Sequence, residues 1–215
     1  MQPLAPAPEP AHFSGWCSTK TLLRGDVLFE QNDAASFIYV IGSGVIRLSA
    51  AVDGREVVTR LARSGDLIGD RLLRGDGYRD ATAVALTETL VYEVSGLDFV
   101  QRSKRQPELW NWVTHQLEQR VDEVERRIQM ISFFRIRHRL MLLLADLADA
   151  FPPCAEGDAV IPLTQSELAQ LVGASRETTS TALNQLERQG LVHLGRGSVR
   201  VFNPERLRRL VHKNA

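Results

Sequence analysis

Hydrophobic and polar positions follow two different patterns along the chain, and the change falls at Gly96. Before this glycine, apolar residues stand in short runs separated by turn residues. The clearest runs are residues 45–48, 56–61, 80–86 and 89–94. Asp53-Gly54 lies between the first two runs and is typical of a hairpin turn, because such turns need positive φ. Many short strands predict an antiparallel barrel or jelly roll over residues 21–106.

Beyond Pro107 the apolar residues recur at steps of three or four, which is the period of a helix. They are Trp110, Val113, Leu117, Val121, Val124, Ile128 and Ile131. Charged residues occupy the remaining faces, and a stripe this narrow is typical of a coiled-coil seam. We therefore predict a dimerisation helix over residues 107–135. Its predicted interface is Leu117, Val121, Val124, Ile128 and Ile131. The start of this helix could also rest on the barrel. The alternative is a helix that packs on the barrel alone.

The last part of the chain, residues 136–215, carries several helix-end signals. A helix predicted over 137–150 ends at Phe151-Pro152-Pro153, because proline interrupts a helix. Thr164 and Glu167 match a capping box, which starts a second, short helix. The first twenty residues are rich in proline and predict a flexible arm (1–20).

A tight turn and a third helix follow the capping box. Gly173 suits the turn because glycine adopts the left-handed conformation easily, and Ser175 caps a helix over residues 176–189. Two short strands around Gly195-Arg196-Gly197 predict a hairpin wing. Two helices joined by a short glycine turn form a helix-turn-helix.

Helix-turn-helix proteins present the first residues of their second helix to DNA base edges. Arginine suits guanine and glutamate suits cytosine, and hydroxyl groups at helix starts suit phosphates. The predicted DNA-binding residues are Thr164, Ser166, Ser175, Arg176, Glu177, Thr178, Ser180 and Thr181. From Val160 onward the chain has eight basic and four acidic residues, a net charge of +4 in a chain that is neutral overall. This asymmetry favours a polyanionic partner.

Composition excludes several classes. The chain has 215 residues, 44% of them hydrophobic, and two cysteines, Cys17 and Cys154. Two thiols cannot build a four-cysteine cluster. No apolar run approaches the roughly 20 residues of a membrane span, and no secretory signal is evident. We expect a cytoplasmic protein without a membrane partner.

The sequence resembles the family of the cyclic-AMP receptor protein and the fumarate–nitrate reductase regulator (CRP/FNR). Residues 168–178, together with Leu183, Leu186 and Gly190-Leu191, carry this resemblance at the helix-turn-helix. Upstream segments also follow the family pattern: 25–29, 38–41, 44–48, 65–70 and 81–85. The resemblance implies an α+β fold with a β-roll effector domain, a long dimerisation helix and a C-terminal winged helix-turn-helix.

The resemblance also implies a function. A homodimer would bind a palindromic promoter site and contact RNA polymerase, with Arg176 and Glu177 at base edges and Thr164, Ser175 and Thr178 at phosphates. Thr181 departs from the family, which often has an arginine there, so the half-site is left open. The chain is not expected to be an enzyme, because residues 21–94 contain no histidine for the metal site of a β-roll oxygenase.

The effector is less clearly indicated. Family members that bind cyclic nucleotides hold the phosphate with a Gly-Glu pair and an Arg-Ser or Arg-Thr pair. Here the first pair is Gly69-Asp70, and Ala81-Thr82 stands at the second, so the arginine is missing. Arg79, two residues earlier, would face the opposite side of a regular strand, although a bulge could reorient it.

A second resemblance is to the cyanobacterial nitrogen regulators that sense 2-oxoglutarate. It implies an arginine before the strand, matched by Arg79, and an arginine and a glutamate on the long helix, matched by Arg120 and Glu125. Two arginines suit two carboxylates. The resulting effector-site prediction is Gly69, Asp70, Arg71, Leu72, Arg79, Thr82, Arg120 and Glu125. The alternatives are no small effector, with these charges simply solvated, or a nucleotide or haem.

Overall fold

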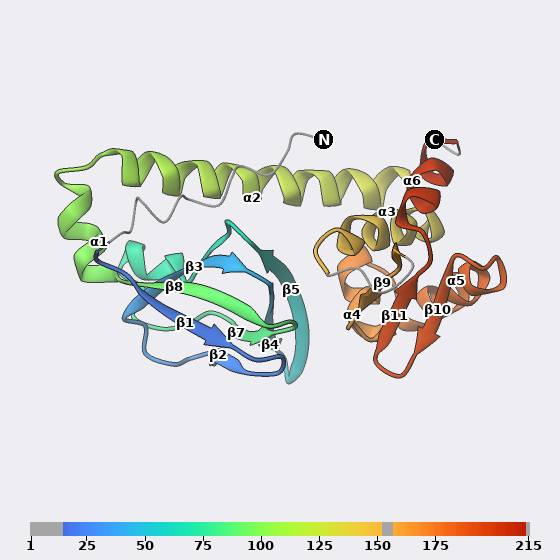
Figure 1. The fold of residues 1–215 in the computed structure, drawn as a ribbon, viewed down its shortest axis with the longest axis horizontal. Coiled ribbons are helices and arrows are strands. Elements are labelled where there is room, and N and C mark those ends of the chain that lie inside the picture. The colour runs from blue at the N-terminus through green and yellow to red at the C-terminus, as the bar shows by residue number, and fades with distance from the viewer. Residues whose placement is uncertain (1–14, 152–156, 214–215) are drawn as a thin grey trace. The chain divides into compact units, whose positions relative to one another are not determined.

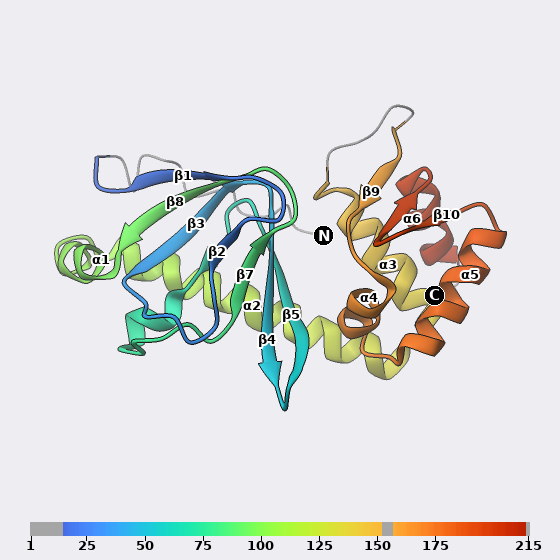
Figure 2. The same ribbon diagram turned by 90° about the horizontal axis from the view of Figure 1, so that it is seen from below.

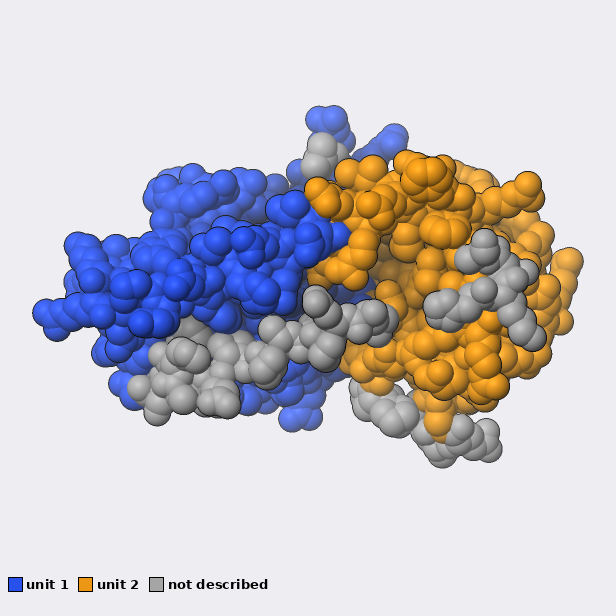
Figure 3. Space-filling view, turned by 90° about the horizontal axis from the view of Figure 1, so that it is seen from above, with its two compact units in different colours: residues 1–122 blue, residues 123–215 orange. Residues whose placement is uncertain are grey.

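The protein, seen here as a computed structural model, is described over residues 15–151 and 157–213. Its internal contacts divide it into two compact units, residues 1–122 and 123–215 (Figure 3). The boundary falls inside the long helix α2 (Glu108–Phe133), so each unit contains about half of this helix. The predicted segment 107–135 thus contains one continuous helix, over residues 108–133, whose residues are shared between the two units.

The first unit is built from two four-stranded sheets in which all neighbouring strands are antiparallel (Figure 1). One sheet, in spatial order, contains β1 (Ser18–Leu22), β8 (Thr89–Ser95), β3 (Phe37–Ser43) and β6 (Leu67–Ile68). The other contains β2 (Val27–Phe29), β7 (Thr82–Ala85), β4 (Val45–Val52) and β5 (Arg55–Arg63). The predicted β-roll is confirmed. So is its hairpin turn, where Asp53 and Gly54 have φ of 51° and 73°.

Strand β3 shows how the roll is filled. Tyr39 and Ile41 belong to the core cluster that also contains Phe29, Ile46 and Ala83 from the other sheet. The alternate residues Ile38 and Val40 belong to a second cluster, where helix α1 (Gly96–Ser103) contributes Phe99 and α2 contributes Leu109 and Val113. Alternation along the strand thus buries both faces of this sheet. It also confirms that the start of α2 rests on the roll.

Two sequence predictions for the first unit are wrong in detail. Strand β1 begins at Ser18 and pairs with β8, so residues 18–20 of the predicted flexible arm are part of a sheet. Strand β7 begins at Thr82 rather than Asp80. Arg79 lies before this strand, so strand alternation does not fix the direction of its side chain.

In the described part of the second unit, four helices follow α2: α3 (Ile136–Ala148), α4 (Gln165–Val172), α5 (Arg176–Arg188) and α6 (Pro204–Lys213). A three-stranded antiparallel sheet accompanies them, in the order β10 (Val192–Gly195), β11 (Ser198–Val201) and β9 (Ala159–Ile161). Helix α3 packs against α5 and α6 (Figure 2). The predicted helix-turn-helix and hairpin wing are confirmed, whereas the pattern analysis did not identify α6, β9 or α1.

Some predictions fall outside the described residues: the arm up to residue 14, the helix-ending Pro152-Pro153, and Cys154. In the described part of the chain, no helix combines the length and hydrophobicity that a bilayer crossing requires.

Candidate functional site

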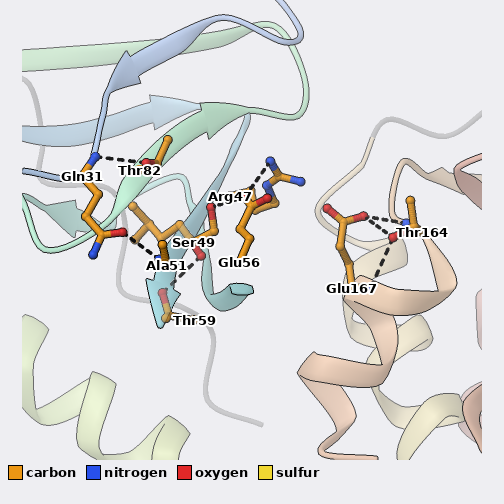
Figure 4. Close-up of polar contacts among 10 residues, drawn as sticks. Gln31, Arg47, Ser49, Ala51, Glu56, Thr59, Thr82, Thr164 and Glu167 are labelled. Carbon is orange, nitrogen blue, oxygen red and sulfur yellow. Dashed lines mark hydrogen bonds and ion pairs between the residues drawn. The ribbon is translucent and has the colours of Figure 1, made fainter. Parts of the chain in front are cut away.

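The start of α4 and the turn after it are fixed by local hydrogen bonds. The Thr164 amide donates to Glu167 Oε2 at 2.7 Å, and the Glu167 amide donates to Thr164 Oγ1 at 3.2 Å, which completes the predicted capping box (Figure 4). At the other end of α4, Gly173 has φ of 65° and ψ of 53°. A Cβ built on Gly173 would lie 2.8 Å from the Ile131 side chain, so both the turn and this close approach require glycine.

Helix α5 presents a buried and an exposed face. Its inner side chains, Thr179, Ala182, Leu183 and Leu186, are buried. The Ser175 hydroxyl accepts from the Thr178 amide at 3.2 Å, so the helix starts where predicted. Of the predicted DNA-binding residues, the structure exposes Thr164, Ser166, Ser175, Arg176, Glu177, Thr178 and Thr181, whereas Ser180 is half-buried. The leading turn of α5 is therefore open to a ligand.

Several of these exposed side chains already have internal partners, among them the hydroxyls of Ser175 and Thr178, which lie 3.0 Å apart. The Glu177 carboxylate folds back on the helix start: its own backbone amide, and next the Ser175 hydroxyl, donate hydrogen bonds that lower the pKa of Glu177. The Thr181 hydroxyl donates to the Glu177 carbonyl oxygen at 3.0 Å. Because that hydroxyl is used inside the helix, Thr181 offers mainly its methyl group to an outside partner.

The predicted seam on α2 is an exposed apolar stripe. Leu117, Val121, Val124, Ile128 and Ile131 have 40%, 56%, 54%, 59% and 45% of their surface exposed. Val113, which continues the same stripe towards the helix start, is only 4% exposed because it packs on the roll.

In the second unit, Arg127 donates to the Gln170 carbonyl oxygen of α4 at 2.5 Å, and burial lowers the pKa of Arg127.

Within the roll, the predicted effector residues divide into pairs. Arg120 donates from two nitrogens to the Asp70 carboxylate, at 3.2 and 3.1 Å, and from one of them to the Leu67 carbonyl oxygen at 3.2 Å. The Arg120 and Asp70 side chains are only 31% and 16% exposed. This two-point pair holds α2 against the short 3₁₀ helix Asp70–Arg74, so neither charge is free for a ligand.

Arg79 has a different environment. It is 5% exposed, and its guanidinium lies 4.3 Å from the centre of the Phe29 ring and 5.3 Å from that of Tyr39. One nitrogen donates to the Phe37 carbonyl oxygen at 2.8 Å. The other two guanidinium nitrogens, Nε and Nη1, are buried without a hydrogen-bond partner. Burial lowers the pKa of Arg79, although an arginine side chain stays charged.

Gly69 completes this site. A Cβ built on it would lie 2.3 Å from Arg79 Nη1, so the glycine makes room for the guanidinium. Strand alternation, which would have turned Arg79 to the opposite side, does not apply, since the residue precedes β7 and turns into the core. Sequence reasoning also missed Phe29 and Tyr39. The sequence feature that could have identified them is an aromatic residue on each of two strands, β2 and β3, that face one another across the roll.

The remaining predicted effector residues are engaged elsewhere. Arg71 pairs with Asp80 at 2.8 Å, with both side chains half exposed. Leu72 packs closely against Gly96 of α1, and the Thr82 hydroxyl accepts from the Gln31 amide at 3.0 Å (Figure 4). These contacts give the three residues internal neighbours, and their assignment to an effector stays a prediction. Glu125 is exposed and belongs to the second unit, so its role stays a prediction.

Comparison with known proteins extends this picture. Residues 19–106 match the cyclic nucleotide-binding domain family, and residues 135–210 match the Crp-like helix-turn-helix domain family. The cyclic AMP receptor protein of Thermus thermophilus is 31% identical over 180 residues, which cover 83% of this chain and 81% of that protein. The CRP-like cAMP-activated global transcriptional regulator of Mycobacterium tuberculosis is 30% identical over 190 residues, or 86% and 84% of the two chains.

A similar solved structure is that of a CRP/FNR-family transcriptional regulator from Thermus thermophilus. It superposes with a TM-score of 0.73 at 26% identity and covers 91% of this chain and 98% of that one. The matched relatives are transcription regulators rather than enzymes.

Proposed function

Because the chain belongs to the CRP/FNR family of DNA-binding transcription regulators, we propose that it acts as a homodimer on a palindromic promoter site under the control of a small anionic effector. The observation that carries the DNA part of this proposal is the exposed leading turn of α5, where Arg176 and Glu177 stand free of the core. At a promoter, the dimer would also contact RNA polymerase.

The chemistry of α5 suits a G·C-containing half-site. An arginine pairs with guanine O6 and N7, and a glutamate accepts from cytosine N4. Glu177 is held at the helix start by hydrogen bonds and would exchange them for the base. Ser175, Thr178 and Thr164, the residue before α4, would turn their hydroxyl groups to phosphates. Thr164 would give up its present hydrogen bond to Glu167 for this, and Ser175 and Thr178 would give up theirs to each other. Two such helices in one dimer would enter successive major grooves about 34 Å apart.

A homodimer is supported by the stripe on α2. Five apolar side chains at heptad-like spacing are 40–59% exposed, and a second copy of the same helix would cover them. Native mass spectrometry should give twice the 24.0 kDa chain mass. Val124→Glu places a charge in the seam and should yield monomers, whereas Glu125→Lys, on the neighbouring face, should not. A wild-type monomer at micromolar concentration would contradict the proposed dimer.

The effector proposal rests on Arg79. A buried guanidinium with two unpartnered nitrogens is costly to maintain, and an anionic ligand would satisfy both. Arg79, Gly69 and the rings of Phe29 and Tyr39 would form the anion-binding end of the site. Proteins that resemble this chain over most of its length are named as cAMP-activated, and a cyclic phosphodiester fits a single guanidinium.

The number of free cations separates the candidate effectors. A cyclic nucleotide has one negative charge at its phosphate and needs one cation, which Arg79 supplies. 2-Oxoglutarate has two carboxylates, and its second would need Arg120, whose guanidinium is already bound at two points to Asp70. This count favours a singly charged effector over a dicarboxylate.

The experiment for the effector is isothermal titration of the full chain with cyclic AMP, cyclic GMP and 2-oxoglutarate in parallel. We expect binding of a cyclic nucleotide that is absent in Arg79→Met. Binding of 2-oxoglutarate alone would contradict the charge count, and binding of none of the three by protein freshly purified from its own cells would contradict this class of effector.

The experiment for DNA binding is selection of duplexes from a random library, followed by titration across salt. A palindrome with half-site centres one helical turn apart is expected, with log affinity falling steeply as log salt rises. No enrichment of any sequence, with and without effector, would contradict the proposed promoter binding.

A further inference from the structure

An open groove runs beside the reading face of α5 in the second unit. Its volume is about 380 Å³, and one wall is made by Thr178, Thr181 and Gln185 of α5. The first turn of α3 makes the other wall with Ile136 and Arg137. Helices α3 and α5 are neighbours in this unit (Figure 2). The groove therefore places a cation from α3 next to residues assigned above to DNA.

Arg137 has a charge that is not neutralised within the protein. Its Nη2 donates to Gln189 Oε1 at 2.7 Å, and this acceptor is a neutral amide. Its Nε is buried without a hydrogen-bond partner. Among the described residues no carboxylate pairs with Arg137, and the one acid that lines the groove, Glu177, is held by its own amide and Ser175.

The position of the groove follows from the spacing on α5. Glu177, Thr181 and Gln185 recur every four residues and form one stripe. Thr178, the next residue around the helix from Glu177, also lines the groove beside α3. A helix with its side chains is about 10–12 Å across, which nearly fills a major groove about 12 Å wide. Groups that flank the helix therefore meet the sugar-phosphate backbone rather than the bases.

From this placement, and resting on the DNA binding proposed above, we infer that Arg137 binds a DNA phosphate beside the recognition helix α5. The guanidinium exchanges Gln189 for the phosphate, and Thr178 donates its hydroxyl to the same backbone segment. The apolar side chain of Ile136 provides a surface for the adjoining deoxyribose. Arg137 thereby adds sequence-independent affinity and fixes the depth of α5 in the groove, without reading a base.

The test uses the full chain, with anisotropy titrations on the selected palindrome and on a scrambled duplex between 50 and 300 mM salt. Each phosphate contact contributes about 0.9 to the slope of log affinity against log salt. Arg137→Gln is expected to weaken binding to both duplexes by the same factor and to lower the slope by about 0.9 per half-site. Arg137→Lys keeps the charge and should restore most of the slope.

Gln189→Ala is the matched control, because it removes the internal partner and leaves the cation in place. If Arg137 binds phosphate, Gln189→Ala keeps the wild-type slope. An effect of Gln189→Ala equal to that of Arg137→Gln would show that the pair merely orients α5 and would overturn the inference. An unchanged slope in Arg137→Gln would also overturn it. If the proposed DNA binding itself were wrong, the wild-type protein would bind no selected duplex. The wild-type titration therefore separates that outcome from a failure of the Arg137 inference.

Discussion

The charged side chains of the proposed effector site and those at the start of α5 lie in different surroundings. In the first unit, Asp70 and Arg120 form a largely buried two-point pair, and Arg79 is buried with two nitrogens unpartnered. In the second unit, Arg176 and Glu177 are exposed at the start of α5. A buried charge has lost its hydration and needs an opposite charge, whereas an exposed charge stays hydrated and gains little from any single partner.

This difference predicts two kinds of recognition. At the roll site, one guanidinium decides whether an anion binds, so the loss of one residue should abolish the response. On the DNA-binding surface, affinity is the sum of many modest contacts, so single losses should be graded and salt-dependent. The predictions below test this contrast, beginning with the largest effect.

Arg79→Met should remove effector binding almost completely. Two charge-assisted hydrogen bonds at roughly 1.5–3 kcal/mol each correspond to at least a hundredfold loss of affinity. Methionine retains apolar contact with Phe29 and Tyr39, so the roll should stay folded. Effector titration by calorimetry measures the loss, and circular dichroism checks the fold. A loss of effector affinity below tenfold would mean that effector binding at the roll does not depend on the Arg79 cation alone.

Arg176→Ala should reduce discrimination at one base pair of the half-site by roughly 1–3 kcal/mol, because one bidentate guanine contact is lost. Binding to scrambled DNA should change much less. Competition titrations with the selected duplex and its single-base variants measure this. Equal weakening on every duplex would make Arg176 a phosphate contact instead of a reading residue.

Asp70→Asn should change which anion the roll accepts. Replacing the carboxylate by an amide frees Arg120 to bind a second carboxylate, so affinity for 2-oxoglutarate should rise about tenfold, or 1.4 kcal/mol. Affinity for a cyclic nucleotide should change less. Parallel calorimetric titrations compare the two ligands. No gain for the dicarboxylate would show that the Asp70–Arg120 pair does not limit the effector charge.

The stability of the second unit should depend on pH through His138. Burial lowers the pKa of His138, which stacks on Phe134 at a centroid distance of 4.4 Å. The unfolded chain therefore binds more protons than the folded one as pH falls through about 6.5. The free energy of unfolding should keep its full His138 contribution above this pH and fall below it. Urea unfolding at pH 7.5 and 5.5 measures the decline, and an equal decline in His138→Gln would assign it to other groups.

The smallest effect is expected for Thr181→Val. The Thr181 hydroxyl donates to the Glu177 carbonyl and is not offered to DNA, and valine keeps the outward methyl. DNA affinity and sequence preference should remain within about 0.5 kcal/mol of wild type. Selection from a random library compares the two preferences. A different selected half-site would show that the hydroxyl turns outward in the complex.

Local chemistry explains why the geometry of the helix-turn-helix could be predicted from sequence. The capping box of Thr164 and Glu167 and the left-handed turn at Gly173 depend on residues within a few positions of each other, so their types determine the geometry. The exposed stripe on α2 was predicted for the same reason, because helical spacing alone places it on one face.

The effector site depends on contacts between residues distant in sequence, and there prediction was weaker. Whether Arg120 was free depended on Asp70, fifty positions away along the chain. The direction of Arg79 depended on the strand starting at Thr82 and on space left by Gly69. Leu72 and Thr82 were assigned to a ligand because of their place in a motif, although tertiary packing gives them structural neighbours.

The close approach of Ile131 to Gly173 has a consequence for communication along the chain. Ile131 is partly exposed on the seam stripe and at the same time covers the turn that precedes α5. Any side chain added at position 173 would have to push this isoleucine aside and disturb the stripe. In the proposed dimer, a partner helix that repositions Ile131 would also act on the turn before α5. This single side chain would then link subunit pairing to the position of α5.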